Sequence, residues 1–352
     1  MIKNNDKPDT KFEYSGYTRG KYSLILIGIL VCILVYFIDF LFSSTYLNPT
    51  ELLKTLFNPS EASQTMRVIV FNLKLPQVTI ALIVGAAFGF AGAIMQTMLN
   101  NPLASPYTLG ISAGAGFGAS LAMVLGLGSL AVLGTYAIPA FAFIFSLLAC
   151  GGIYLIAQLK GFSAEVMVLA GIGLVFFFQA LQALMQYLAS PEALQGIVFW
   201  TFGSVSGADW ENISLILIIF LVFFIAIYRK SWMLTAMKLD DNKAKALGVD
   251  TARIRKVLFV CTSLLTASCV AFVGCIGFVG IVGPHVARML IGEDQRFFLP
   301  MSCVCGATLL VIADFASKFF GNGVVFPIGI LTSLVGVPFF FYLLIKKRTV
   351  RD

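Results

Sequence analysis

Charged residues and histidine are scarce in this sequence. Only 12% of its 352 residues are charged and one is histidine, whereas about 25% charged residues is usual in soluble domains. Hydrophobic residues make up 59% of the chain, and the mean hydropathy is +0.93. This composition excludes a soluble globule and predicts an all-α, multi-pass bundle of transmembrane helices, surrounded by lipid in the cell membrane.

The sequence also lacks the residue sets that common catalytic and metal sites need. It has no G-x-x-x-x-G-K-[ST] loop, so we expect no ATP binding by that route. Cys303 and Cys305 have too few possible partners for a metal site, because His285 is the only histidine. Gly110–Gly114 fits the G-x-S-x-G pattern, but it enters an apolar segment and so indicates helix packing. We therefore expect no enzyme activity, no bound metal and no cofactor.

Ten apolar segments predict ten membrane-spanning helices, since about 20 residues cross the hydrocarbon core as a helix. The second segment carries Gly85, Gly89 and Gly92 at helical spacing, which predicts close packing against neighbouring helices. Glycines and Pro284 interrupt the eighth segment, so eight or nine crossings remain an alternative. The ten segments are 23–42, 78–99, 107–127, 137–158, 166–187, 213–228, 257–273, 274–290, 299–313 and 326–345.

Lysine and arginine are distributed unevenly between the two sides of this bundle. Ten crossings place both termini on one side, and 20 of the 24 Lys and Arg residues lie there. The positive-inside rule identifies that side as cytoplasmic. We expect a cytoplasmic tail at 1–22, a transmembrane domain at 23–345 and a second cytoplasmic tail at 346–352. The net charge of +7 follows from these loops, and no basic domain that could bind nucleic acid is predicted.

The longest cytoplasmic segment, 229–256, contains the run KLDDNKAKALGVD. Its Ala and Lys content favours a short exposed helix that ends at Gly248. A helix with so few apolar residues is stabilised either by a partner or by solvent alone, and the sequence leaves both possibilities open.

Three glutamines occur in the fifth crossing. Gln179, Gln182 and Gln186 share one helical face because of their spacing. Polar side chains there face protein or water rather than lipid. Amide hydrogen bonds between helices would satisfy them about as well as a polar pathway, and our hypothesis is that they line a pathway.

Several longer motifs follow one another along the chain. They are KLPQ, GAIMQ, NPLASPYTLGISAGA, WTFGSVSGADW, ALGVD, GFVGIVGPHVARMLIG, ADFASK and FPIGILTSLVGVPFFFYLL. In this order they resemble the permease subunits of ABC importers for iron-siderophore, haem and cobalamin. The resemblance covers nearly the whole chain from the first helix. It implies two permease subunits with ten helices each, two separate cytoplasmic ATPases and an extracytoplasmic substrate-binding protein.

The resemblance also implies roles for residues on the outer side. Lys74 and Lys318 correspond to basic contacts for acidic residues of the binding protein. Gln77 replaces a second basic residue of the family, which should weaken that link. Val325 replaces a usual glutamate, so any role of that carboxylate is absent or moved.

On the cytoplasmic side, the resemblance implies a coupling surface for the ATPases and a gate. The coupling residues are Asp240, Asp241, Ala244, Leu247 and Gly248, with Asp240 where the family usually has glycine. The gate residues are Asn101, Leu103 and Ser163.

We therefore expect the chain to be the permease subunit of an importer that carries a metal chelate, an iron-siderophore complex, inward. Haem or cobalamin are alternative cargoes, and the second permease subunit is either another copy or a relative. An ion-coupled secondary transporter is an alternative of a different class. It is disfavoured because Asp39, Glu165 and Asp314 lie near helix ends and no carboxylate lies at mid-crossing.

Overall fold

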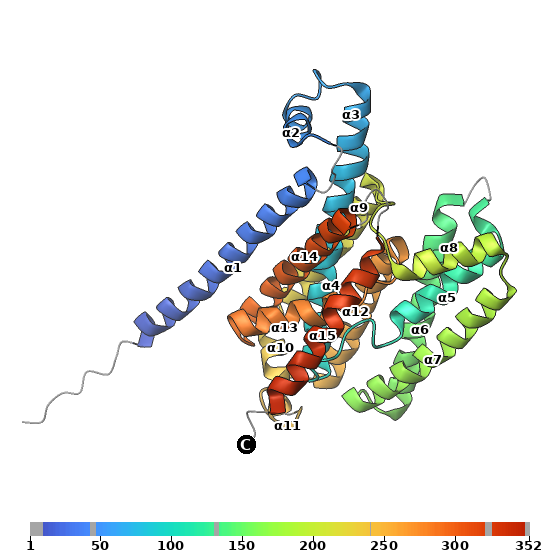
Figure 1. Ribbon diagram of the computed structural model, residues 1–352. Coiled ribbons are helices and arrows are strands. Elements are labelled where there is room, and N and C mark those ends of the chain that lie inside the picture. The colour runs from blue at the N-terminus through green and yellow to red at the C-terminus, as the bar shows by residue number, and fades with distance from the viewer. Residues whose placement is uncertain (1–9, 43–46, 130–133, 240, 321–325, 349–352) are drawn as a thin grey trace, which may run out of the picture.

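The described part of the chain is an assembly of helices (Figure 1). The computed structural model describes residues 10–42, 47–129, 134–239, 241–320 and 326–348. The first half comprises α1 (Thr10–Phe42), α2 (Pro49–Phe57), α3 (Gln64–Val68), the π-helical turn η1 (Ile69–Lys74), α4 (Leu75–Met98), α5 (Ile111–Val124), η2 (Leu127–Ser129), α6 (Gly134–Lys160) and α7 (Ala164–Leu188). The second half comprises α8 (Pro191–Phe202), α9 (Trp210–Tyr228), α10 (Ser231–Met237), α11 (Asp241–Ala246), α12 (Thr251–Val273), α13 (Val279–Ile291), α14 (Gln295–Phe320) and α15 (Ile328–Arg348). These ranges contain no strand, so the predicted all-α class is confirmed.

Each of the ten predicted crossings corresponds to an apolar helix. Within the described ranges, seven helical segments are long and apolar enough to span a membrane: Tyr17–Phe42, Gln64–Met98, Gly134–Lys160, Ala164–Leu188, Trp210–Tyr228, Thr251–Val273 and Gln295–Phe319. The other three predicted crossings correspond to the shorter helices α5, α13 and α15. The chain is thus a multi-pass membrane protein.

Two helices begin earlier than the sequence predicted. α1 starts at Thr10, so the described part of the predicted tail at 1–22 is helical. The second crossing was predicted from residue 78, but helix continues from Gln64 through η1 into α4. Pro76 has no backbone N–H to donate within the helix. The preceding turn is widened, with the Leu75 N–H donating to the Val70 carbonyl, which is the i to i−5 bond of a π-helix.

The segment 189–212, between the fifth and sixth predicted crossings, contains the helix α8. Ser190 caps this helix by accepting a hydrogen bond from the Ala193 N–H over 3.3 Å. Pro191 follows at the first helical position, where its missing donor costs nothing. Trp210 of α9 donates its Nε1–H to the Phe71 carbonyl over 2.8 Å. The segment is therefore ordered by local caps and by a contact with η1.

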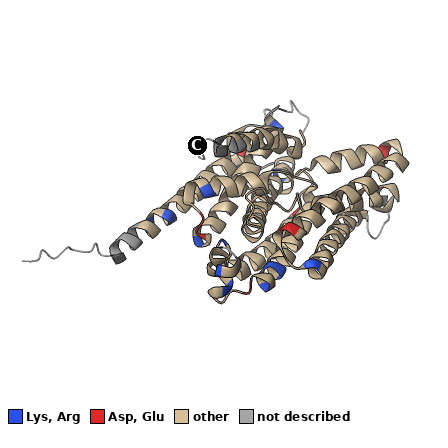
Figure 2. Ribbon diagram, turned by 90° about the horizontal axis from the view of Figure 1, so that it is seen from below, with Lys and Arg blue, Asp and Glu red and all other residues tan. Residues whose placement is uncertain are grey.

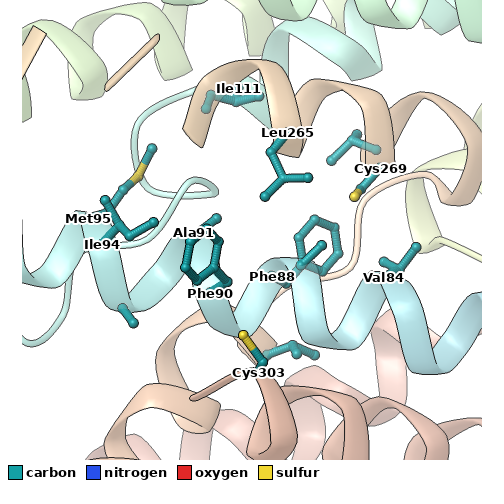
Figure 3. Close-up of a cluster of buried hydrophobic side chains, with 14 of the residues drawn as sticks. Val84, Phe88, Phe90, Ala91, Ile94, Met95, Ile111, Leu265, Cys269 and Cys303 are labelled. Carbon is teal, nitrogen blue, oxygen red and sulfur yellow. The ribbon is translucent and has the colours of Figure 1, made fainter. Parts of the chain in front are cut away.

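The central element of the bundle is α4. It packs against α12, α13 and α14, while α5 to α8 form a group to one side and α1 lies on the other, where it packs against α14 (Figure 1). In the main core, Leu265 of α12 lies on one side of α4, near Phe88, and Cys303 of α14 lies on the other side (Figure 3).

Glycines allow these helices to approach one another closely. A Cβ atom at Gly85 would lie 2.6 Å from the carbonyl oxygen of Gly306 in α14. A Cβ at Gly89 would overlap the Ser302 carbonyl, and one at Gly92 would overlap the backbone of Gly280 in α13. The predicted packing role of the three α4 glycines is confirmed, and it leaves α4 tightly held along its length.

Candidate functional site

We call the end of the bundle that carries α2 and α3 the outer end, and the end that carries α10 and α11 the inner end (Figure 1). The predicted docking lysines lie at the outer end. The Lys318 ammonium lies 2.7 Å from the Asp314 carboxylate and 3.0 Å from the Asp39 carboxylate. Both carboxylates are fully buried. Gln77 donates from Nε2 to Asp314 Oδ1 over 3.1 Å. Asp314 and Lys318 are four residues apart, so they share one face of α14.

Lys74 completes this group, which we call the outer polar cluster: Asp39, Lys74, Gln77, Asp314 and Lys318. Its ammonium donates to the Phe40 carbonyl over 2.9 Å. The cluster therefore joins the outer ends of α1, α4 and α14. Sequence reasoning missed the part played by Asp39, because no local pattern relates α1 to α14. A docking role for the two lysines stays a prediction. Both ammonium groups already bond to groups within the chain, so a docked protein would share them with these internal bonds.

The predicted coupling residues lie at the inner end. Asp241 begins α11, whereas Asp240 and also Val325 lie outside the described residues. Ala244 is buried, while 56% of the Leu247 side chain is exposed. Gly248 has φ +81°, and its N–H bonds to the Lys245 carbonyl, so it ends the helix as the sequence predicted. In Figure 2, seen from this end, Lys and Arg are found mostly in loops and near helix ends.

The predicted gate residues lie in two segments at the inner end, 98–105, which starts at the last residue of α4, and 161–163; we call them the inner turns. Asn101 Oδ1 accepts the Leu103 N–H over 2.9 Å, which fixes the first turn locally. Ser163 caps α7 by accepting the Val166 N–H over 3.3 Å. Each gate residue thus has an identified local structural role, and gating stays a prediction.

Arg255, in the second turn of α12, connects the two inner turns. Its Nε donates to the Met98 carbonyl over 3.1 Å, and its Nη1 donates to the Phe162 carbonyl over 3.4 Å. Only 8% of Arg255 is exposed. Sequence reasoning grouped Arg255 with the other basic residues of 229–256, since the sequence carries no signal that it is buried.

A second polar network at the inner end was also missed. Glu293 lies 2.8 Å from the Lys238 ammonium and 2.9 Å from Nε of Arg288. Arg288 also donates to Oε1 of the buried Gln96 over 2.7 Å. Partial burial disfavours the Glu293 carboxylate, but the hydrogen bond and charge of Lys238, followed by Arg288, outweigh it and lower the pKa of Glu293. The network links the segment after α10 to the inner end of α4.

The three glutamines of α7 have different surroundings. Gln182 donates to the Thr201 hydroxyl of α8 over 3.1 Å, and its amide lies over Gly116. Gln179 is exposed and Gln186 is half-buried. Gln182 thus has the amide bond between helices that the sequence offered as the alternative. Lining of a pathway stays a prediction for this face. Among the described residues, no group of three His, Cys, Asp or Glu side chains could hold a metal ion.

The chain is similar along most of its length to known transport proteins. The model of the FecCD transport family matches residues 26–346. The iron-uptake system permease protein FeuC of Bacillus subtilis is 34% identical over 332 residues, which cover 93% of this chain and 98% of FeuC. A provisionally named ABC transporter permease protein of Methanocaldococcus jannaschii is 38% identical over 288 residues, which cover 80% of this chain and 82% of that protein.

A solved protein structure is also similar to this chain. It is described as an inward-facing conformation of an ABC transporter provisionally assigned to the metal-chelate type. The match has a TM-score of 0.80 at 29% identity and covers 92% of this chain and 99% of that one. The resemblance to ABC importer permeases is thereby confirmed. Because the family match extends from the first predicted crossing to the last, this chain belongs to the FecCD transport family.

Proposed function

We propose that the chain is the permease subunit of an ATP-binding-cassette importer that moves an iron-siderophore complex into the cell. A second permease subunit, either another copy or a relative, pairs with it. Two separate ATPase subunits supply the energy, and an extracytoplasmic binding protein supplies the cargo. The observation that carries this proposal is the arrangement at the inner end, where α11, with Leu247 exposed just beyond it, leads into α12, which contacts both inner turns.

The proposed cargo is supported by the iron-uptake relative FeuC, which is similar over almost its whole length. Haem and cobalamin are the alternative cargoes of the same importer class. The binding protein would select among them, because it delivers the ligand to the permease. Charge complementarity at the outer polar cluster would orient that protein and speed docking more than it would strengthen binding.

The proposed mechanism uses the two ends in turn. ATP-driven closure of the ATPases would press on α11 and shift the bundle between inward-open and outward-open states, which requires that the ATPases bind the two states differently. Asn101, Leu103 and Ser163 would form the gate at the inner turns. The glutamine face of α7 would line the path between the ends.

Uptake by reconstituted vesicles tests the proposal. The chain alone should take up no ferric hydroxamate, and uptake should require the ATPase, ATP and the binding protein together. Leu247→Ser should reduce this uptake, because Leu247 is an exposed apolar side chain just beyond α11 that we expect an ATPase subunit to contact. Phe57→Ser is the matched control, since Phe57 is 76% exposed at the outer end, away from the ATPases. Uptake driven by an ion gradient without ATP would contradict the proposal.

Docking is tested separately through Lys74. Lys74→Gln should weaken binding of the binding protein, and Lys54→Gln in α2, an exposed outer lysine, is the control. Lys318 is unsuitable for this docking test, because its ammonium pairs with two buried carboxylates and its removal would disturb the fold. Unchanged affinity of the Lys74→Gln chain would reject the docking role of this lysine.

A further inference from the structure

Arg255 holds two backbone segments that are distant in sequence. Its side chain reaches Met98, the last residue of α4, and Phe162, which directly precedes Ser163. The two acceptors lie 157 and 93 residues away along the chain. One side chain therefore fixes the first and second inner turns relative to each other and to α12.

A buried guanidinium at this position is costly unless its donors are used. Removing a charged group from water is unfavourable, and hydrogen bonds to backbone carbonyls offset part of that cost. Carbonyls at helix ends are suitable acceptors, because the last four of each helix lack partners within it. Met98 ends α4, so its carbonyl is one of these.

A neighbouring residue strengthens the same contact. The Lys256 ammonium lies 4.9 Å from the centre of the Phe162 ring, and that ring meets Tyr154 edge to face at 5.2 Å. Two consecutive side chains of α12 thus hold the turn that precedes α7. The turn is therefore held by a cation–π contact of Lys256 as well as by the hydrogen bond of Arg255.

The position of Arg255 in the chain connects it to the coupling surface. α11 ends at Ala246, and α12 begins five residues later at Thr251, capped by Asp250. α11 also contacts α12 directly. A displacement of α11 would therefore move the start of α12, and with it the guanidinium that holds both inner turns.

We propose that Arg255 is the positioning residue that transmits movement of the coupling segment to the gate. The proposal rests on the proposed importer function and adds the mechanical link within this chain. An arginine is needed because its planar fork donates in two directions at once, to Met98 and to Phe162. A lysine has one flexible ammonium and cannot hold both carbonyls in the same geometry.

Gate labelling in the assembled complex of permease and ATPase tests the proposal. Leu103→Cys reports on the first inner turn through its reaction with a water-soluble maleimide, with and without a non-hydrolysable ATP analogue. The chain without the added cysteine gives the background. With Arg255 present, the analogue should change the labelling rate. In Arg255→Lys the change in labelling rate caused by the analogue should be about tenfold smaller, while ATP hydrolysis continues.

Arg296→Lys is the matched control. Arg296 is an exposed arginine at the inner end that pairs with Asp294 over 2.6 Å. This variant should keep the full nucleotide response. An undiminished response in Arg255→Lys would overturn the inference while leaving the importer function intact. A complex with native Arg255 that shows no response to nucleotide would contradict the proposed function itself.

A second measurement needs no change at Arg255. Spin labels at Ala252→Cys and Glu165→Cys, both exposed, flank the link on α12 and α7. If Arg255 joins the two segments, the distance between the labels should stay constant when the ATP analogue binds, even as the gate label responds. A change in that distance would show that the segments move independently and would overturn the inference, even if Arg255→Lys does not assemble.

Discussion

Lys318 in α14 lies 3.0 Å from Asp39 in α1, although 279 residues separate them in the chain. Asp314, one helical turn before Lys318, accepts a second bond from the same ammonium over 2.7 Å. One partly buried cation, with 10% of its side chain exposed, thus faces two fully buried carboxylates. The contact adds a polar link between the outer ends of α1 and α14, two helices that also pack against each other.

Removing the cation from this cluster should destabilise the fold. Lys318→Met leaves two carboxylates buried without their partner, and we expect a loss of about 3–5 kcal/mol in the free energy of unfolding. The triple variant Asp39→Asn, Asp314→Asn, Lys318→Met should lose less, because it removes both fully buried carboxylates together with their cation and leaves only the half-buried Lys74 charged. Thermal unfolding in detergent measures both, with Lys54→Met as the exposed control. Equal losses in the single and triple variants would contradict this account.

Close packing of α4 predicts a sharp difference between two glycines. A Cβ at Gly89 would overlap the Ser302 carbonyl, so Gly89→Ala should cost about 1–3 kcal/mol through overpacking. A Cβ at Gly173, in the middle of α7, has nothing within 4 Å. Gly173→Ala should therefore be neutral or slightly stabilising, since alanine favours helix. Melting temperatures in detergent compare the two, and an unaffected Gly89→Ala chain would show that α4 and α14 are further apart.

The glutamine face of α7 can be tested for contact with water. Cysteines at Gln179 and Gln186 should react with a membrane-impermeant maleimide, because the reactive thiolate forms in water. Leu184→Cys is the control on another side of the helix, and it should react more slowly by about tenfold. Gln182→Cys should fall between them, since this position faces Thr201. If all three glutamine positions fail to react in every nucleotide state, the pathway hypothesis is wrong.

The ion pairs of Glu293 predict a pH dependence at the inner end. Its pKa is lower in the folded chain than in the unfolded chain. The stabilisation by these ion pairs is therefore present above the pKa of Glu293 in the unfolded chain, about 4.3. It is lost as the pH falls through the pKa of Glu293 in the folded chain. Glu293→Gln should reduce the loss of melting temperature below about pH 4 while leaving assembly intact. The effect should be small and sensitive to salt, because about half of the Glu293 side chain is exposed. Glu61→Gln, at an exposed glutamate between α2 and α3, is the control. If it reduced the acid-induced loss of melting temperature by the same amount, the effect could not be assigned to the ion pairs of Glu293.

The sequence by itself determined the class of protein and the set of helices. Long apolar segments must hydrogen-bond their own backbones in lipid, so run length alone predicted ten helices and the all-α class. Local patterns also predicted the helix end at Gly248 and the packing glycines. Helix ends were less accurate: the start of the second crossing moved from residue 78 to Gln64, because a π-turn accommodates Pro76.

The tertiary structure alone decided which helices meet. Periodicity shows which residues share a face, but it carries no information about which other face lies opposite. The contacts of Lys318 with Asp39 and of Arg255 with Met98 join residues 279 and 157 positions apart, and they exist only because α1, α12 and α4 pack as they do. In both cases a charge that looked like a surface feature of the sequence is buried by helices from elsewhere in the chain, and its role follows from that burial.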